Sequence, residues 1–136
     1  MFIVSSCLIG NNCKYNGGNN YNEDVVEFCR NHEVILVCPE TSGGLKSPRM
    51  PAEQQYKKAS DGNLGIRVID KEGNDLTENF HKGAVVSLEQ AFKKADELSE
   101  EIEGAILKAN SPSCGSDNIY DGTFTGTLIS GDGIFA

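Results

Sequence analysis

The sequence predicts one α/β domain built on a mostly parallel sheet that helices cover. Two short runs, VILVC (34–38) and AILK (105–108), are almost entirely apolar, which is typical of strands buried on both faces. Stretches with the apolar spacing of helices lie between such runs, and this alternation favours parallel strands joined by crossover helices. The length of 136 residues suits a single domain with a sizeable core.

The N-terminal part of the chain contains two predicted strands with a helix between them. The first strand covers residues 1–8 and runs into a loop over 10–20 that is rich in Gly and Asn. Asn22 is expected to cap a helix over 23–31, because an Asn side chain can accept a hydrogen bond from the first helical turn. The second strand covers 34–38. In a parallel sheet the two strands would end at the same edge, where ligands commonly bind.

The middle of the chain is predicted to hold a long loop, a strand and the longest helix. Residues 39–63 contain three prolines and three glycines and are expected to form a mostly irregular loop. A strand over 66–69 precedes a helix over 78–99, which Thr77 should cap. The apolar face of that helix comprises Phe80, Ala84, Val85, Leu88, Ala91, Phe92 and Ala95. With a last strand over 105–108, these elements predict a three-layer, Rossmann-like domain of about four or five strands, with the first strand at or next to the centre.

The charge of the chain excludes several classes of partner. There are 20 acidic and 12 basic side chains, which give a net charge of −8. Nucleic acids and anionic membrane surfaces both need a basic protein surface, so we expect neither as a partner. The sequence has no apolar run long enough to span a membrane and no export signal at its N-terminus, which favours a cytoplasmic protein.

Five cysteines are present, and three of them occupy the same kind of position. An odd number of cysteines without an export signal argues against a disulfide framework. Cys7, Cys38 and Cys114 each follow a predicted buried strand, so the three thiols should converge and could bind zinc, copper(I) or an iron–sulfur cluster. The alternative is that they pack as small hydrophobic residues. Cys13 is either a fourth ligand or a loop thiol, whereas Cys29 is expected in the core.

Polar side chains flank the three strand-end cysteines. Glu40, in a Cys-Pro-Glu sequence, is a candidate general acid or base, and the alternative is a solvated loop acid. Ser111 and Ser113 could position a substrate or cap their own turn. Arg49 lies between two prolines and is suited to binding an anion or a carbonyl oxygen of the substrate, or it pairs with Glu40 or Glu53.

Four segments of the sequence resemble a known family. They are SSCLIGNNCKYNGG (5–18), VCPETSGGLKSPRMPAE (37–53), GNDLTENFHKGA (73–84) and LKANSPSCGSDNIYDGTFTG (107–126). In this order they resemble the bacterial domain-of-unknown-function 523 family, which includes the thiouracil desulfidases. The resemblance covers nearly the whole chain.

The resemblance implies a cofactor, catalytic groups and a reaction. The cofactor is a 4Fe–4S cluster, and its ligands would be Cys7, Cys38 and Cys114. The catalytic groups would be Glu40 and a serine, Ser111 in preference to Ser113. The expected function is iron–sulfur-dependent, non-redox desulfuration of a small thiocarbonyl compound, such as a thiouracil-like thionucleobase, with release of sulfide. The alternative is a metal- or cluster-binding module without catalytic activity, which ligation by Cys13 would favour.

The C-terminal end departs from the family pattern. Relatives usually continue past the Gly-Asp-Gly segment (131–133) into a further helix and strand, whereas this chain ends at Ala136. We therefore expect residues 1–136 to form a single domain of this family type without the usual C-terminal helix and strand. An apolar sheet edge left open in this way could be covered by a second subunit in a homodimer.

Overall fold

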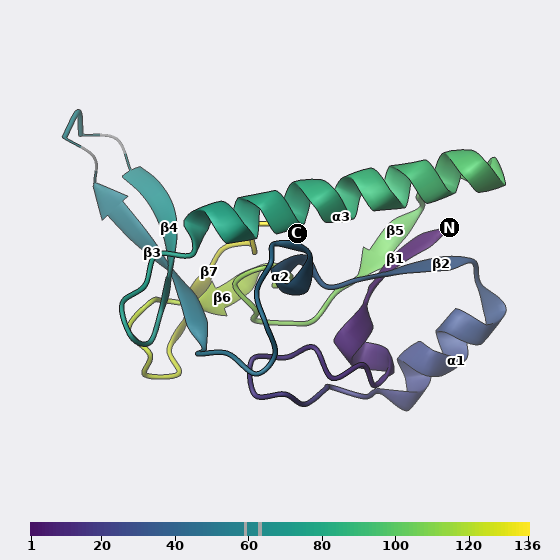
Figure 1. Cartoon of the computed structure of the whole chain (residues 1–136), viewed down its shortest axis with the longest axis horizontal. Coiled ribbons are helices and arrows are strands. Elements are labelled where there is room, and N and C mark those ends of the chain that lie inside the picture. Colours follow the sequence, from purple (N-terminus) through teal and green to yellow (C-terminus); the bar gives the residue numbers. More distant parts are fainter. Residues whose placement is uncertain (59, 63) are drawn as a thin grey trace.

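The computed structural model describes residues 1–58, 60–62 and 64–136. At its centre lies a parallel sheet in the order β2-β1-β5, which has three strands within the described residues (Figure 1). The strands are β1 (Phe2–Ser5), β2 (Val34–Val37) and β5 (Gly104–Ile106). Phe2 lies opposite both Val34 and Gly104, so the first strand is central, as predicted. The sheet is narrower than the four or five strands expected.

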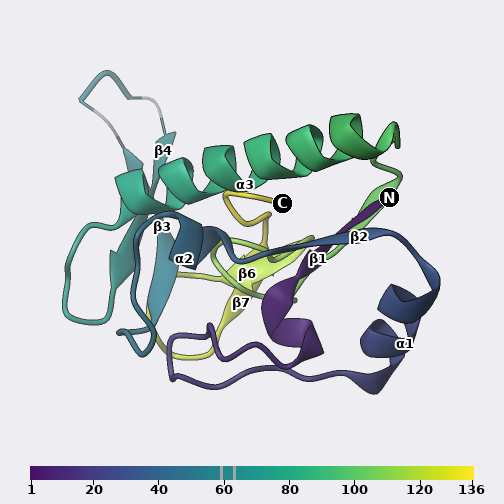
Figure 2. The same cartoon turned by 45° about the vertical axis from the view of Figure 1, so that its right-hand side comes forward.

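Two helices cover opposite faces of this sheet (Figures 1 and 2). They are α1 (Glu23–Asn31) and α3 (Thr77–Leu98). Ile3 of β1 belongs to the same core cluster as Ala84 and Ala91 of α3. The preceding residue, Phe2, makes an edge-to-face contact with Phe28 of α1 at 5.0 Å between ring centroids. Because neighbouring side chains of a strand point to opposite faces, these contacts establish three layers.

Helix α1 begins where the sequence predicts. The side chain of Asn22 accepts a hydrogen bond of 3.1 Å from the backbone N–H of Val25, which confirms Asn22 as the cap. Cys29 on this helix is only half-buried and lies outside the core cluster, so its predicted core position is wrong. The reason is that α1 covers the sheet only loosely, since none of its residues is fully buried.

The predicted long loop contains regular structure. It begins with the short helix α2 (Pro39–Ser42), and from residue 52 it forms β3 (Ala52–Lys58), which pairs antiparallel with β4 (Leu64–Asp70). The segment therefore holds more regular structure than expected, although residues 43–51 lie outside helices and strands. The β3 sequence AEQQYKK lacks an apolar alternation, and only its pairing with the apolar β4 shows that it is a strand. Residues 59 and 63 of the segment lie outside the described residues.

Two further corrections concern exposure. The strands β2 and β5 were predicted to be buried on both faces, but Leu36 and Ala105 are exposed because these strands form the two edges of the sheet. Thr77 is the first residue of α3 rather than its cap, and its hydroxyl accepts a hydrogen bond from the Val68 N–H of β4. Within the described part of the chain, no helix is long and apolar enough to cross a membrane.

A second antiparallel pair completes the fold. It consists of β6 (Asn118–Tyr120) and β7 (Leu128–Ser130). The last residues of the chain return to the sheet, where Phe135 packs in the same core cluster as Cys114. The Phe135 N–H donates a hydrogen bond of 2.9 Å to the carbonyl of Ser113. The C-terminal segment therefore supports the loop that carries Cys114.

Candidate active site

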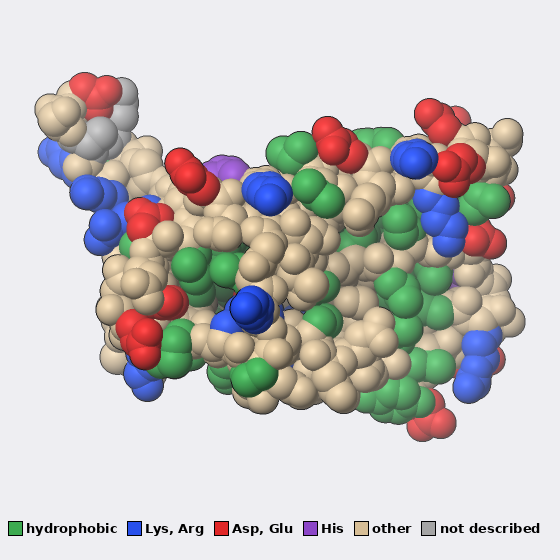
Figure 3. Space-filling model, in the orientation of Figure 1, with side chains coloured by type: hydrophobic (Ala, Val, Ile, Leu, Met, Phe, Trp, Pro, Cys, Tyr) green, Lys and Arg blue, Asp and Glu red, His purple; other side chains and the backbone are tan. Residues whose placement is uncertain are grey.

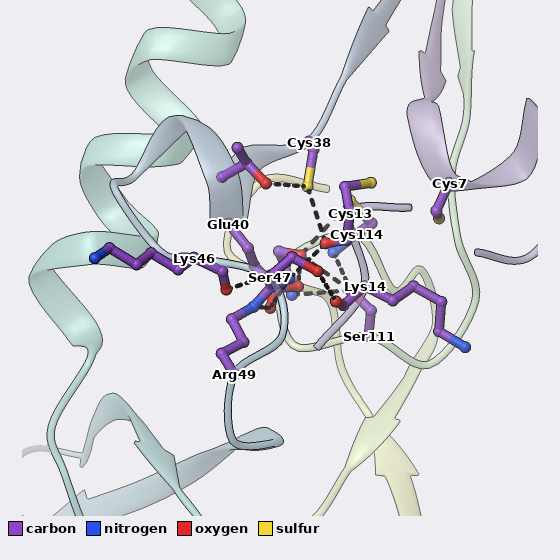
Figure 4. A network of polar contacts seen from close by, with 12 residues as sticks. Cys7, Cys13, Lys14, Cys38, Glu40, Lys46, Ser47, Arg49, Ser111 and Cys114 are labelled. Atoms are coloured by element: carbon purple, nitrogen blue, oxygen red, sulfur yellow. Dashed lines mark hydrogen bonds and ion pairs between the residues drawn. The ribbon is translucent and has the colours of Figure 1, made fainter. Parts of the chain in front are cut away.

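A cysteine follows each strand of the parallel sheet at the same edge. Cys7 lies in the 3-10 helix η1 (Ser6–Ile9) directly after β1, and Cys38 lies between β2 and α2. Cys114 belongs to the loop that follows β5. The three thiols are close enough to influence one another electrostatically. Figure 4 shows their side chains in the same region, so the structure brings together the three cysteines that the sequence singles out.

The turn that carries Cys7 is fixed by backbone and side-chain hydrogen bonds. The carbonyl of Cys7 accepts hydrogen bonds from the N–H groups of Gly10 and Asn20, at 3.3 and 2.9 Å. Gly10 ends η1 with a φ of 100°, a left-handed conformation that favours glycine. The amide of Asn20 also donates to the Cys7 sulfur at 3.8 Å. The loop over 10–20 therefore folds back onto the first cysteine.

Close packing of α2 on α3 determines where Cys38 and Glu40 lie. A Cβ atom at Gly83 of α3 would overlap the carbonyl oxygen of Pro39, so the two backbones are in direct contact. The Asn79 side chain donates a hydrogen bond of 3.0 Å to the Gly43 carbonyl and secures the end of α2. Since Pro39 stands between Cys38 and Glu40, this contact fixes both functional residues.

Glu40 is held in an ion pair at the edge of the sheet. Its Oε1 atom accepts hydrogen bonds from Nε and Nη2 of Arg49 at 3.2 and 3.1 Å, and both side chains are largely buried. Its Oε2 atom accepts a hydrogen bond of 2.9 Å from the hydroxyl of Ser113. The carboxylate is therefore oriented by three hydrogen bonds and is not a solvated loop acid. Of the two pairings foreseen for Arg49, the structure has the one with Glu40.

The two serines form one hydrogen-bonded unit with Glu40. The Ser111 hydroxyl oxygen accepts hydrogen bonds from the N–H groups of Ser113 and Cys114, at 3.1 and 2.8 Å. The two hydroxyl oxygens are 3.0 Å apart. Because Ser113 donates its proton to Glu40, its oxygen is left to accept the proton of Ser111. The result is a chain of hydroxyl groups that ends on the Glu40 carboxylate.

A cavity of about 430 Å³ opens beside these groups. Cys7, Cys13, Cys114, Glu40 and both serines line it. The rest of the lining includes the basic residues Lys14, Lys71, Lys108 and Arg49 and the aromatic residues Tyr15, Tyr120 and Phe124, together with Glu53 and uncharged residues. On a chain with a net charge of −8, a wall with three lysines is a local reversal of sign that favours anionic ligands or products.

A family model described as 2-thiouracil desulfurase matches residues 2–136. The chain belongs to this family. The uncharacterized protein YbbK of Bacillus subtilis (strain 168) is 39% identical over 137 residues, which cover 100% of this chain and 87% of YbbK. The predicted family resemblance is thereby confirmed.

A solved structure supports the same assignment. It is described as the 4Fe–4S-dependent thiouracil desulfidase TudS (DUF523Vcz), and it matches with a TM-score of 0.79 and 32% sequence identity. The match covers 98% of this chain and 80% of the TudS chain. The predicted α/β class with a parallel sheet is confirmed.

In this member of the 2-thiouracil desulfurase family, the thiols of the site differ in acidity. The pKa of Cys7 is lowered to about 7, because interactions with the Cys13 thiol and the Asn20 amide outweigh the effect of burial. The pKa of Cys38 is raised, first by its interaction with the Cys13 thiol and then by burial. Burial also raises the pKa of Cys114. Of the three strand-end thiols, Cys7 is therefore the one whose pKa is lowered.

The arrangement of the thiols suits a cluster better than a single ion. Within the described ranges, no three Cys, His, Asp or Glu side chains lie close enough to hold one metal ion. In an iron–sulfur cluster the cysteines bind separate irons, so they surround the group without touching one another. Sulfur is also the donor that such clusters require. The three strand-end thiols therefore fit a 4Fe–4S cluster.

Several residues of the site were not foreseen in the sequence. Thr41 donates a hydrogen bond of 3.2 Å to the Cys38 sulfur, and Asn20 contacts Cys7. The ammonium group of Lys108 lies near the Cys7 thiol, and burial lowers its pKa. Gln54 of β3 donates to the Pro112 carbonyl at 3.0 Å, which braces the serine loop. Lys108 could have been identified from the sequence because it lies at the end of a predicted strand. Nothing in the residues around Gln54 marks it as part of the site.

Proposed function

We propose that this protein is an iron–sulfur-dependent desulfidase that hydrolyses the C–S bond of a small thiouracil-like compound and releases sulfide. The observation that carries the proposal is a carboxylate–hydroxyl pair, Glu40 and Ser113, on the wall of a cavity that two of the three strand-end thiols, Cys7 and Cys114, also line. Membership of the 2-thiouracil desulfurase family and the match to TudS support the same reaction. The net reaction adds water, replaces sulfur by oxygen and transfers no electrons.

Three cysteines would hold the cofactor in this proposal. They are Cys7, Cys38 and Cys114, which come from the ends of three different strands. A 4Fe–4S cluster with three protein ligands supplies one iron that is open to the thiocarbonyl sulfur and acts on it as a Lewis acid. Because the backbone on both sides of each cysteine is held in place, the three thiols are already in position before the cluster binds.

Glu40 is proposed as the general base that activates water. One of its oxygens pairs with Arg49, and the other accepts the hydrogen bond of Ser113. A water molecule that gives its proton to Glu40 can attack the thiocarbonyl carbon, after which the C–S bond breaks. The proton then returns from Glu40 to the departing sulfur, so that the carboxylate is regenerated.

The two serine hydroxyls connect the Glu40 carboxylate to the cavity through hydrogen bonds. The proton of Ser113 is committed to Glu40, whereas Ser111 can turn its proton toward Ser113 or toward a bound ring. We therefore assign binding of the heterocycle to Ser111 and proton relay to Ser113. Two backbone N–H donors hold the Ser111 oxygen in place, so the group needs no reorganisation during the reaction.

Arg49 supports the reaction mainly through Glu40. Of the five N–H groups of a guanidinium, four donate here, to Glu40 twice and to the carbonyls of Lys46 and Cys13. One N–H of Nη1 remains for a carbonyl oxygen of the substrate. We therefore propose that this single N–H makes the predicted contact between Arg49 and the substrate.

The setting of the enzyme follows from the same features. We propose a small thio-heterocycle as substrate in preference to a nucleic acid, because the net charge of −8 repels polyanions. We also propose a reducing compartment, the bacterial cytoplasm, because all five cysteines are free thiols. The exposed edge at Ala105 of β5 supports the proposal of a homodimer.

The test is anaerobic reconstitution followed by counting of iron and sulfide and by a thiouracil turnover assay. Replacing Cys114 by Ala should abolish cluster binding, because two of the proposed thiolates cannot hold the cluster. Glu40→Gln should keep the iron but lower turnover by about a hundred- to ten-thousand-fold, the usual range for a proton-transfer group.

Two matched variants control for the change of residue type. Cys29→Ala removes a free thiol on α1 that does not line the cavity, and Glu27→Gln removes an exposed carboxylate on the same helix. Both should retain full iron and turnover. Unchanged turnover in Glu40→Gln would remove this residue from the mechanism, and unchanged iron in Cys114→Ala would remove the proposed ligand set.

A further inference from the structure

A fourth thiol shares the cavity with two of the proposed cluster ligands. Cys13 lies in the loop over 10–20 and lines the same cavity as Cys7 and Cys114. Its thiol interacts with those of both Cys7 and Cys38. Figure 4 shows its side chain between these two cysteines. Cys13 is therefore a member of the thiol group and not an isolated loop cysteine.

The position of Cys13 is tied to the reacting end of the site. Nη2 of Arg49 donates hydrogen bonds to the Cys13 carbonyl at 2.9 Å and to Glu40 at 3.1 Å. The Cys13 N–H donates to the Asn11 carbonyl at 2.9 Å. The same guanidinium thus holds the backbone of Cys13 and the proposed base. The backbone of Cys13 is consequently anchored to the same guanidinium that holds the proposed base, while its sulfur stays free to change partner.

Cys13 differs from the other three cysteines in its surroundings. Cys7, Cys38 and Cys114 directly adjoin regular elements or the buried serine loop, whereas Cys13 belongs to an irregular loop. Cys13 is half-exposed, like Cys38, whereas Cys7 and Cys114 are buried. Its sulfur also has an alternative polar partner, the hydroxyl of Ser6 at 3.4 Å. Because the thiol can form this hydrogen bond instead, it loses little free energy when it leaves a metal ligand position.

We propose that Cys13 is an exchangeable fourth ligand, which closes the open iron in the resting enzyme and yields it to the thiocarbonyl sulfur of the substrate. This inference rests on the proposed function. In the exchange, the iron–sulfur bond to Cys13 breaks and a bond to the substrate sulfur forms. The N–H proton of the thioamide passes to the departing Cys13 thiolate, and no electrons are transferred. Ser6 then holds the released thiol.

Ligation of the open iron by Cys13 would lower the apparent affinity of the protein for its substrate. A ligand that must displace Cys13 binds with an apparent affinity reduced by the fraction of open sites. With minor states commonly populated at about 10% or less, removal of Cys13 should lower the KM for thiouracil by about tenfold or more. The kcat should stay unchanged, because Cys13 takes no part in the proposed water attack.

The test compares iron loss from the reconstituted wild-type protein with that from Cys13→Ala and Cys13→Ser under ferricyanide, a mild one-electron oxidant. An iron without a thiolate ligand is the first to leave on oxidation. Wild type should lose one iron at least about tenfold more slowly than either variant. Iron counting and electron paramagnetic resonance follow the loss without reliance on turnover. Cys29→Ala, which lacks a thiol outside the cavity, should behave like wild type.

The possible results separate this inference from the proposed function. Equal rates of iron loss in wild type and both Cys13 variants would overturn the inference while leaving cluster binding and turnover intact. Failure of both Cys13 variants to take up any iron would also overturn it, because Cys13 would then be a permanent ligand. If wild type itself takes up no iron, the proposed function fails and the inference fails with it.

Discussion

The two sides of α3 differ in burial, and the side with the larger apolar residues is the exposed one. The side that packs against the sheet and α2 consists mostly of small residues, and its buried members are Phe80, Gly83, Ala84, Ser87, Ala91 and Ala95. The adjoining flank carries the large apolar residues Val85, Leu88 and Phe92, all of which are exposed. Figure 3 shows hydrophobic side chains at the surface along this helix.

The closeness of approach between backbones determines which residues of α3 are buried. At Gly83 the helix touches the backbone of α2, and a larger side chain would displace the segment that carries Cys38 and Glu40. The small residues therefore serve the site by allowing a short distance between two backbones. The large residues of the flank have no such role, and they lie where the described part of the chain has nothing to cover them.

The largest effect is expected on the small-residue side. Gly83→Val places methyl groups against the Pro39 carbonyl, and overpacking of this kind typically costs about 1–3 kcal/mol. Because α2 must move, iron content after reconstitution and thiouracil turnover should fall together. The free energy of unfolding is measured by urea denaturation, and iron is counted on the same samples.

A matched glycine provides the control for this change. Gly65 in β4 is exposed, and a Cβ atom there would meet only the Lys57 carbonyl at an ordinary distance of 3.7 Å. Gly65→Val should therefore leave stability within about 0.5 kcal/mol of wild type and iron content unchanged. If Gly83→Val is as stable and as fully loaded as Gly65→Val, close backbone contact does not position the site.

A smaller effect of opposite sign is expected at Ser87. This residue is fully buried, and its hydroxyl has no hydrogen-bond partner among the described residues. Ser87→Ala removes the unsatisfied group and improves helix propensity, so it should stabilise the protein by about 1 kcal/mol. Thermal unfolding of the two proteins measures the difference. A marked loss of stability would show that the hydroxyl has a partner in solution.

The smallest effect is expected on the exposed flank. Phe92 is 59% exposed, and Ser has a similar helix propensity, so Phe92→Ser should change the free energy of unfolding by about 0.5 kcal/mol or less. Turnover should be unaffected. A loss of about 2 kcal/mol would instead mean that Phe92 is covered in solution, and the comparison between the two sides of α3 would have to be revised.

Much of the site could be predicted from local sequence signals. Apolar runs mark where β1, β2 and β5 lie, and the cysteines that follow them converge because parallel strands end at one edge. The cap of α1 was readable because Asn22 bonds to a residue only three positions away. The position of Glu40 beside the thiols follows from the rigid Pro39 that joins it to Cys38. Each of these signals acts over a few residues.

Other features depended on contacts between distant segments. The sequence left open whether Arg49 pairs with Glu40 or Glu53, and only the folded chain brings the Glu40 carboxylate to its guanidinium. Ser113, which donates to Glu40 across 73 positions of sequence, ranked below Ser111 in the sequence-based prediction.

The same limit explains the wrong predictions. Helical spacing identified an apolar stripe on α3, but spacing cannot tell which part of a wide stripe faces a neighbour. Strand β3 has no apolar alternation and exists because β4 supplies its hydrogen-bond partners. Composition and periodicity determined the strands, the cap and the thiol set, since these depend on neighbouring residues. Tertiary structure decided partners, buried faces and the fourth thiol's place in the cavity, because those depend on how closely separate backbones approach.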